Sequence, residues 1–443
     1  MWVTWRSGRR TVEGVGLMGG ALRSRLTVVS SLVTGVALLL AACSSDATAP
    51  EPDDADQDAT HAEQEQDPEF EVFEPPTTFD EDAEVTIEEA LPDPYVTGHS
   101  VTAAHFYELG EGDDVVYYSN TDGLRAHSVV RDTELWEVPT ENAVTEAQYG
   151  TGVALGEIDG EPVVAGSFVT TTPGEGTIAD QYHLETIAVD AQTGDVRWHV
   201  VQDRDGTRSV PVLVAGVSDA GVVVTYGGTH GLDPADGSTR WTDEDTTSYG
   251  MDGGLVLGRD RMGRADVATT RVVTADTGEE QWRTDGLPHA WLAGEGRLLV
   301  THSYGSDGGA RGEVLDMATG AVQHEFPAPE VSGNTQGVTF QCAADHQDLV
   351  ACWVRGRGHL TAYDLDSGEN LWTLSPEATP DRNAPNDADM ALWHGALYSD
   401  LSVLDLRDGT DMELEPGVKP HATNGVIGIR IERENLAAYP AIG

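Results

Sequence analysis

The sequence returns to one short pattern six times between residues 189 and 413. Each copy holds an apolar run and a turn containing glycine, and most copies place a tryptophan four residues after that glycine. The copies read VDAQTGDVRW at 189–198, LDPADGSTRW at 232–241, VTADTGEEQW at 273–282, LDMATGAVQH at 315–324, YDLDSGENLW at 363–372 and LDLRDGTDME at 404–413. Their last residues are 41 to 48 positions apart. One four-stranded blade of a β-propeller needs roughly this length, so the period predicts an all-β propeller.

Two further units set the number of blades. A degenerate copy lies at 118–136, and an incomplete copy at 425–440 stops before its turn and tryptophan. A ring must close, because an open sheet edge invites aggregation. We therefore expect a strand from the N-terminal side, between about 70 and 105, to complete the last unit. The count favours eight blades, and seven blades are the alternative.

The repeated residues have structural roles in such a ring. Glycine supplies the left-handed backbone conformation of a tight turn, where a side chain would clash. Tryptophan offers a large apolar plate, which we expect to be buried against the neighbouring blade. The turn glycines are Gly194, Gly237, Gly278, Gly320, Gly368 and Gly409. The tryptophans are Trp136, Trp198, Trp241, Trp282 and Trp372.

The N-terminus predicts export. Arg23 and Arg25 precede an apolar run at 26–40, which is too short for a membrane span and typical of a secretory signal. The run ends in Leu-Ala-Ala-Cys, which resembles the bacterial lipoprotein lipobox. The resemblance implies a signal peptide at 1–42 and a lipid, with acyl chains such as palmitate, on Cys43. An ordinary cleaved signal with an incidental cysteine is the alternative, and the start is either Met1 or Met18.

The next segment predicts a spacer. Residues 46–90 contain eighteen Asp or Glu and five prolines but no Lys or Arg. Such a composition cannot bury enough apolar surface to order itself. We assign 43–90 to the lipidated cysteine and a disordered acidic tether, and 91–443 to the propeller. Phe70, Val72 and Phe73 interrupt the acidic run and are either a docking segment or apolar residues of the tether.

Charge excludes one class of partner. The chain has 25 Lys and Arg against 76 Asp and Glu, a net charge of -51. Such a chain repels phosphate backbones and anionic lipid headgroups. We therefore expect no nucleic-acid binding, and membrane attachment through the lipid anchor alone.

The repeat unit resembles the PQQ-like repeat of the quinoprotein-dehydrogenase-like propellers, an apolar strand followed by Asp-Gly and then LxAxDxxTGxxxW. The resemblance covers roughly 115–440 and is specific for fold, although one propeller frame carries many unrelated sites. With the lipobox, it implies an extracytoplasmic lipoprotein on the outer leaflet of the cell membrane. It further implies a non-catalytic, monomeric scaffold that binds an unknown envelope protein or a small ligand. A diverged dehydrogenase that depends on quinone or calcium is the alternative.

The cysteines and histidines bear on that alternative. Dehydrogenases of the resembling family use two adjacent cysteines against the quinone, and this chain has no such pair, so we expect no cofactor and no enzyme activity. Cys342 and Cys352 lie ten residues apart on two β-like runs, which predicts a disulfide across a hairpin. Two buried thiols or a metal pair are the alternatives. The fourteen histidines show no HxH or HExxH spacing, so no metal site is predicted.

One irregularity marks a candidate contact site. The second unit is lengthened at about 171–183 by the sequence TTPGEGTIADQYH. Loops on the faces of a rigid scaffold carry function disproportionately often. This segment is therefore a candidate binding loop, and a merely tolerated insertion is the alternative.

Overall fold

The computed structural model describes the chain from residue 71 onward, with gaps. The described residues are 71–88, 107–110, 112–120, 122–144, 152–174, 179–204, 212–260, 269–285, 289–302, 310–329, 340–354, 357–376, 390–399, 402–413, 417–432 and 435–443. All of them belong to one unit, Gln66–Gly443. In this part of the chain, no helix is long and apolar enough to cross a membrane.

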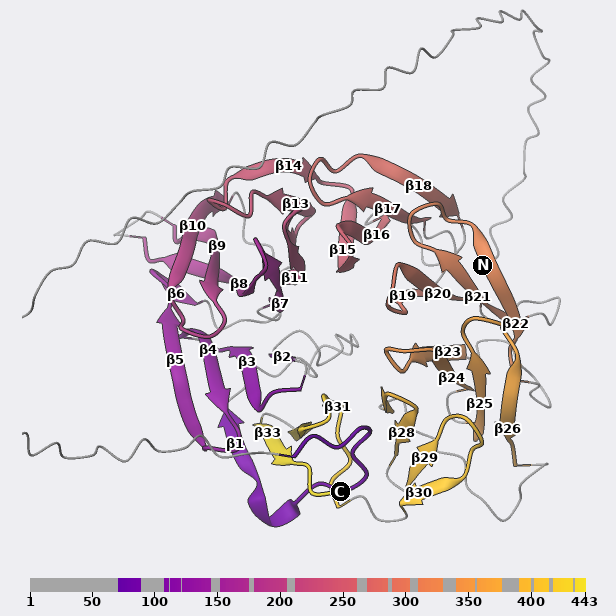
Figure 1. Ribbon diagram of the computed structural model, residues 1–443. Coiled ribbons are helices and arrows are strands. Elements are labelled where there is room, and N and C mark those ends of the chain that lie inside the picture. The colour runs from indigo at the N-terminus through magenta and orange to yellow at the C-terminus, as the bar shows by residue number, and fades with distance from the viewer. Residues whose placement is uncertain are drawn as a thin grey trace, which may run out of the picture. The chain divides into compact units, whose positions relative to one another are not determined.

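Eight antiparallel sheets stand around a ring as the blades of a propeller (Figure 1). Blade 1 has β2 (Tyr107–Leu109), β3 (Val115–Ser119), β4 (Gly123–Ser128) and β5 (Thr133–Pro139); blade 2 has β6 (Ala143–Val144), β7 (Gly152–Ile158), β8 (Glu161–Thr172), β9 (Gln181–Asp190) and β10 (Val196–Arg204); blade 3 has β11 (Val212–Ser218), β12 (Gly221–Tyr226), β13 (Thr229–Leu232) and β14 (Thr239–Asp243); blade 4 has β15 (Thr246–Asp252), β16 (Leu255–Asp260), β17 (Thr269–Thr274) and β18 (Glu280–Asp285). Blade 5 has β19 (His289–Leu292), β20 (Arg297–His302), β21 (Arg311–Asp316) and β22 (Val322–Pro327); blade 6 has β23 (Phe340–Ala344), β24 (Leu349–Val354), β25 (His359–Asp364) and β26 (Asn370–Leu374); blade 7 has β27 (Ala391–Trp393), β28 (Ala396–Tyr398), β29 (Val403–Asp405) and β30 (Asp411–Glu413); blade 8 has β31 (Ala422–Thr423), β32 (Ile427–Glu432), β33 (Asn435–Pro440) and β1 (Val85–Glu88). A short 3₁₀ helix, η1 (Glu81–Ala83), precedes β1.

The core lies in the seams between adjacent blades. Each blade packs face to face against two neighbours, so both faces of its middle strands are covered. The sequence meets this requirement with continuous apolar runs, and all six residues of β12 and all six of β24 are buried. Burial of this apolar surface is the main stabilising contribution to the ring.

Ring closure confirms two predictions from the sequence. β1 forms the rim strand of blade 8 and pairs antiparallel with β33, with Val85 opposite Ala438. The ring therefore has eight blades and closes with a strand from the N-terminal side. This strand lies inside 43–90, the range assigned to the tether, so the folded part begins before residue 91. The acidic composition of 43–90 hides this strand, because two apolar residues, Val85 and Ile87, dock it in the blade 8 core and they change the average composition little.

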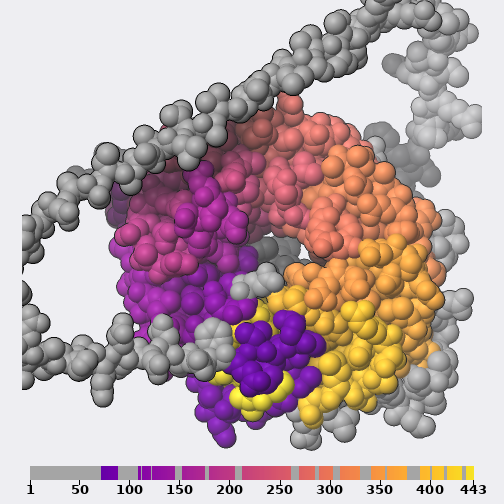
Figure 2. Space-filling model, viewed as in Figure 1, coloured from indigo at the N-terminus to yellow at the C-terminus, as the bar shows by residue number. Residues whose placement is uncertain are grey.

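Residues 71–84 form a strap over blades 7 and 8. Phe79 is 1% exposed and packs against Tyr398, with 6.0 Å between ring centroids. The hydroxyl of Tyr398 donates a hydrogen bond of 2.7 Å to the carbonyl oxygen of Pro76. Glu74 forms an ion pair with His394. Figure 2 shows this indigo segment lying on the yellow C-terminal blades.

The apolar residues at the start of the strap differ from one another. The backbone N–H of Phe73 donates a hydrogen bond of 2.9 Å to the carbonyl oxygen of Gly425. Val72 is 49% exposed, and Phe70 lies outside the described residues. Docking therefore begins at Phe73.

Each repeat tryptophan docks on the turn glycine of the next blade. Trp198 Nε1 donates a hydrogen bond of 2.9 Å to the carbonyl oxygen of Pro234, and a Cβ on Gly237 would lie 2.6 Å from the Trp198 ring. The same contact pairs Trp136 with Gly194, Trp241 with Gly278, Trp282 with Gly320 and Trp372 with Gly409, while Gly368 faces His324. The tryptophan plates thus lie against the neighbouring blade as the repeat predicts, and each adds an indole hydrogen bond that the pattern does not reveal.

Polar side chains in the turns between first and second strands link blades in pairs. Asp219 accepts from the Asp159 N–H at 2.6 Å, Asp252 from the Gly296 N–H at 2.7 Å, Asp345 from the Gly395 N–H at 2.8 Å, and the Asn424 amide donates to the Asp113 carbonyl at 2.9 Å. These bonds staple blade 2 to 3, 4 to 5, 6 to 7 and 8 to 1. Every second seam thus carries the same kind of link.

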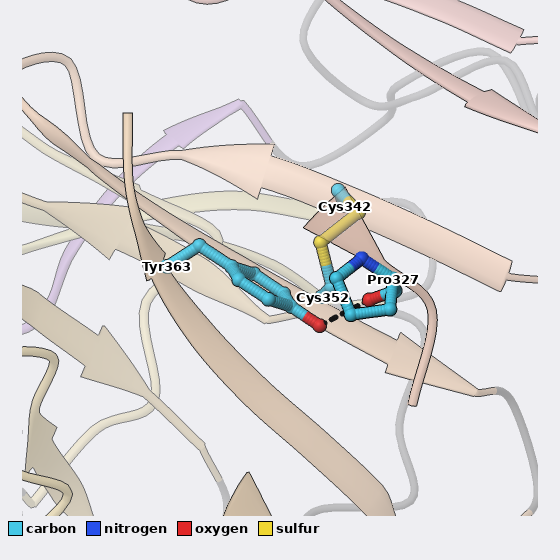
Figure 3. The surroundings of a disulfide bond; sticks show 4 residues. All are labelled: Pro327, Cys342, Cys352 and Tyr363. Carbon is cyan, nitrogen blue, oxygen red and sulfur yellow. Dashed lines mark hydrogen bonds between the residues drawn. A yellow bond between two sulfur atoms is a disulfide. The ribbon is translucent and has the colours of Figure 1, made fainter. Parts of the chain in front are cut away.

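Cys342 and Cys352 form a disulfide between β23 and β24. The two residues lie directly opposite each other in the ladder, with 4.0 Å between their Cα atoms. Tyr363, on β25, lies beside the disulfide and donates its hydroxyl to the carbonyl oxygen of Pro327 (Figure 3). The disulfide thus braces the inner hairpin of blade 6.

Reduction of this disulfide should destabilise the propeller. A crosslink between residues 10 apart restricts the unfolded chain by about 2–3 kcal/mol. For a folded part of this size, the melting temperature should fall by about 2–4 °C. Thermal unfolding of the protein from residue 44, with and without reductant, measures this. The double variant Cys342→Ala, Cys352→Ala is the control, and a response of that variant to reductant would assign the shift to another cause.

Candidate functional site

The two ends of the ring differ in their connections. At one end, which we call the turn face, tight turns join β7 to β8 in blade 2 and the first strand to the second in the other blades, and they join the last two strands of blades 1 to 7. The opposite end, the loop face, carries the connections between blades. The longest of these run from Glu88 to Tyr107 and from Leu374 to Ala391. Because the strap contacts Gly425, in a turn of blade 8, it lies at the turn face, and the loop face is the side on which we look for a binding site.

Blade 2 has the longest strands at the loop face. β8 has 12 residues and β9 has 10, and the predicted insertion at 171–183 supplies the end of β8 and the start of β9. The insertion is therefore partly a β-hairpin extension, and its residues 175–178 lie outside the described residues. The short strand β6 pairs with this extension, with Ala143 opposite Thr171.

A polar cluster occupies the side of blade 2 that faces blade 1. We call it the blade 1–2 cluster; its members are Glu141, Asn142, Thr172, His183, Glu185, His199 and Asp203. Ile187 and Val189, further along the same face of β9, pack against Trp136 and Val138 of blade 1. The cluster thus continues an apolar seam toward the loop face.

Glu185 is the buried centre of this cluster. Its side chain has no exposed surface and lies 2.8 Å from His199 Nε2. The backbone N–H of Glu141 also donates to it. Burial alone would raise the pKa of Glu185, but hydrogen bonds from His199 and the Glu141 N–H, with the charge of His199, hold it below its usual range. The hydrogen bond to Glu185 in turn raises the pKa of His199, against the effect of burial.

A second chain of hydrogen bonds crosses the strands beside Glu185. Asp203 Oδ1 lies 3.0 Å from His183 Nδ1, and His183 Nε2 lies 3.0 Å from Thr172 Oγ1. An ionised carboxylate only accepts, so His183 donates to Asp203 from Nδ1. Thr172 Oγ1 also lies 3.1 Å from Asn142 Oδ1. Both chains thus end on the segment 140–144, which joins blade 1 to blade 2.

The paired charges of Glu185 and His199 should make stability depend on pH. A carboxyl group whose pKa is lowered in the folded state stabilises the protein above the usual carboxyl pKa of 4.5, and this stabilisation is lost as pH falls. An imidazole whose pKa is raised stabilises the protein below the usual imidazole pKa of 6.5, and this stabilisation is lost as pH rises. The contribution is therefore complete between these values. We expect His199→Gln to cost about 1–3 kcal/mol near pH 5.5 and less above pH 8, measured by urea unfolding.

A matched histidine serves as control. His127 Nε2 lies 3.3 Å from Asp132, whose side chain is 74% exposed, so solvent screens the pair. His127→Gln should change stability by a few tenths of a kcal/mol at every pH. Equal pH profiles for the two variants would contradict the role of Glu185.

The other predicted site residues lie apart from this cluster. Cys43 lies outside the described residues. The repeat tryptophans and glycines sit in the seams, and the disulfide lies in blade 6. No group of three or more His, Cys, Asp or Glu side chains within the described ranges could hold a metal ion.

Sequence reasoning found the insertion but missed the cluster beside it. His183 and Thr172 are 11 residues apart, and His183 and Asp203 are 20 apart, so no local motif joins them. Only the register of three long strands brings them together. Glu108, on β2, was also missed; burial raises its pKa to about 8.

A comparison with known protein families finds a match over part of the repeat region. A PQQ-type family model, described as outer membrane protein assembly factor BamB, matches residues 232–392, from blade 3 to the inner strand of blade 7. With eight antiparallel blades in the structure, seven of them four-stranded, this match decides the class. The chain is a β-propeller of PQQ-like repeats. No curated protein matches this PQQ-like propeller in sequence.

Solved structures resemble the PQQ-like propeller at low identity. BamB from Moraxella catarrhalis is 16% identical, with a TM-score of 0.43 over 75% of this chain and 96% of its own. The β-propeller domain of Cps50 (Swd1) from Myceliophteria thermophila is 11% identical, with a TM-score of 0.39 over 77% of this chain and 96% of its own. Hsv2p from Kluyveromyces lactis is 11% identical, with a TM-score of 0.38 over 67% and 88%. Likeness at this level carries no functional assignment.

Proposed function

We propose that this PQQ-like propeller is an extracytoplasmic scaffold lipoprotein that binds a protein partner through its loop face. The observation that carries the proposal is the match of residues 232–392 to a family model described as an assembly factor. That description belongs to the matched family and supports a role in binding rather than in redox chemistry. In this role the protein needs no cofactor.

The N-terminal sequence supports an anchor on the outer leaflet of the cell membrane. The apolar run at 26–40 ends in Leu-Ala-Ala-Cys, and Cys43 is the residue that would carry the lipid. The acidic segment between Cys43 and the strap would span up to roughly 90 Å when extended. Because the strap lies at the turn face, the loop face would point away from the attachment of the tether.

Lipidation is tested by substitution of the anchor residue. Cells expressing the full chain are fed an alkyne-bearing palmitate, and the protein is examined for label and for its distribution between membrane and soluble fractions. We expect label and membrane association for the unmodified chain and neither for Cys43→Ser. Label on the Cys43→Ser variant, or an unlabelled soluble parent chain, would overturn the lipoprotein assignment.

Partner binding is tested by position-specific crosslinking in intact envelopes. A photoreactive residue replaces Gln181, which is exposed at the loop face, or Ala235, which is exposed at the turn face. We expect the first position to capture one defined envelope protein and the second to capture none. Capture from neither position would reject the scaffold function, and capture only from Ala235 would reject the loop face as the binding surface.

The dehydrogenase alternative makes its own prediction. A quinone or calcium ligand present at a hundred times its dissociation constant stabilises a folded protein by about 2.7 kcal/mol. A rise in melting temperature on addition of either would favour that alternative. We expect no shift for the chain from residue 44.

A further inference from the structure

We propose that segment 140–144 is a latch that His199 holds on blade 2 when protonated, and that its release frees the end of β8 for an extended segment of a partner. The partner step rests on the proposed binding function, whereas the latch itself does not.

Within the described residues of blade 2, the latch covers the edge of β8 beyond the reach of β7. The pairing of β7 with β8 there extends as far as Ser167, which lies opposite Gly152. Beyond that point β6 takes its place, with Val144 opposite Thr170. β6 has two residues, so its backbone hydrogen bonds alone cannot hold it. Side-chain contacts must therefore supply most of the stability of this pairing.

Two side-chain hydrogen bonds hold the latch, and one of them depends on charge. The Glu141 N–H donates to buried Glu185, and Thr172 Oγ1 lies 3.1 Å from Asn142. Glu185 keeps its charge in a fully buried position because His199 lies 2.8 Å away. If His199 loses its proton, a buried carboxylate is left without a counter-charge, which is strongly unfavourable. Rehydration of Glu185 by opening of the latch relieves this cost.

Few other charges face His199. Glu185 and His183 come from β9, Asp203 from β10 and Glu141 from the latch, where Glu141 Oε1 lies 3.9 Å from His199 Nδ1. On the blade 1 side of the seam, Trp136 and Val138 are uncharged. Of the two imidazoles among these groups, His183 lies against Asp203 and His199 lies against Glu185, so the counter-charge of buried Glu185 comes from His199.

Opening of the latch would create a docking edge at the loop face. The exposed backbone of β8 between Thr170 and Thr172 could pair with an extended peptide, which is a common mode of protein recognition. β6 itself shows that this edge accepts an extended strand. The partner is therefore expected to bind as a strand in place of β6, and to bind more readily as pH rises through the titration of His199.

Amide hydrogen exchange tests the latch without a partner. Exchange of the peptide covering 140–144 is compared between the full mature chain and His199→Gln at the same pH, so that the intrinsic pH dependence of exchange cancels. We expect about tenfold slower exchange in the parent at about pH 6 and equal rates at about pH 9. His127→Gln should match the parent throughout. A ratio near one at pH 6, or a ratio that does not change with pH, would overturn the latch.

Two further variants test the pH dependence independently of His199→Gln and test partner binding. Glu185→Gln removes the buried charge and should abolish the pH dependence even if His199→Gln folds poorly. The double variant Ala143→Cys, Thr171→Cys changes two directly paired residues and should lock the latch by a disulfide. The locked protein should lose the crosslink at Gln181 that the parent forms. Capture by both proteins would reject β8 as the docking edge, whereas capture by neither would reject the proposed function and leave the exchange result to decide the latch.

Discussion

A chain that begins at residue 91 will not form a stable ring, whereas one that begins at residue 71 will. The shorter chain lacks β1 and the strap, and therefore three buried apolar side chains, Phe79, Val85 and Ile87. Burial of such a side chain contributes about 1.5–3 kcal/mol, so the loss is about 5–9 kcal/mol before the exposed edge of β33 is counted. Urea unfolding of the two purified chains, together with light scattering for aggregation, measures the difference.

A point substitution separates the effect of lost packing on stability from the effect of shortening the chain. Phe79→Ala in the longer chain should cost about 3–5 kcal/mol, because it leaves a cavity against Tyr398. Val72→Ala is the matched control, since Val72 is 49% exposed, and should change stability by less than about 0.5 kcal/mol. Equal stability of the chains from 71 and 91 would mean that β1 does not close the ring.

Gly237→Ala should strongly destabilise the propeller although it adds a single methyl group. Gly237 has φ of 72°, which costs an alanine about 1–2 kcal/mol. Its new Cβ would also lie 2.6 Å from the Trp198 ring, and such overpacking costs a further 1–3 kcal/mol or so. The expected total is about 2–5 kcal/mol in urea unfolding.

Gly160 isolates the steric part of this effect. It has a similar φ of 76°, and a Cβ there would meet nothing within 4 Å. Gly160→Ala should therefore cost only the conformational part, about 1–2 kcal/mol. If the two variants lose the same stability, the docking of Trp198 on Gly237 does not constrain the turn.

Much of the fold follows from the sequence, because the repeat carries its own geometry. The glycine and tryptophan of each unit mark a turn and a plate at fixed spacing, and the structure places Gly237 and Trp198 in contact across a seam. The incomplete unit at 425–440 also predicts that a strand from elsewhere in the chain completes its sheet. A missing strand in a closed ring has to come from the other end of the chain, as β1 does.

The remaining features depend on register and on distant contacts, which the sequence does not display. Asn424 donates to Asp113 across 311 residues, and nothing in either turn marks the other as its partner. Strand β1 was assigned to the tether because composition was averaged over 43–90, whereas Val85 and Ile87 alone decide its docking. The blade 1–2 cluster likewise exists only because β8, β9 and β10 are long enough to align its members.

The strap also determines how the ring would respond to mechanical tension. A pull on the chain ahead of residue 71 reaches the hydrogen bond from Phe73 first, then the ion pair of Glu74, and then the packing of Phe79. The ladder between β1 and β33 bears load only after these contacts have failed. Force applied at this end thus breaks these contacts one after another at the junction of the first and last strands. A stretched propeller would yield by opening at its closure before any other blade lost a strand.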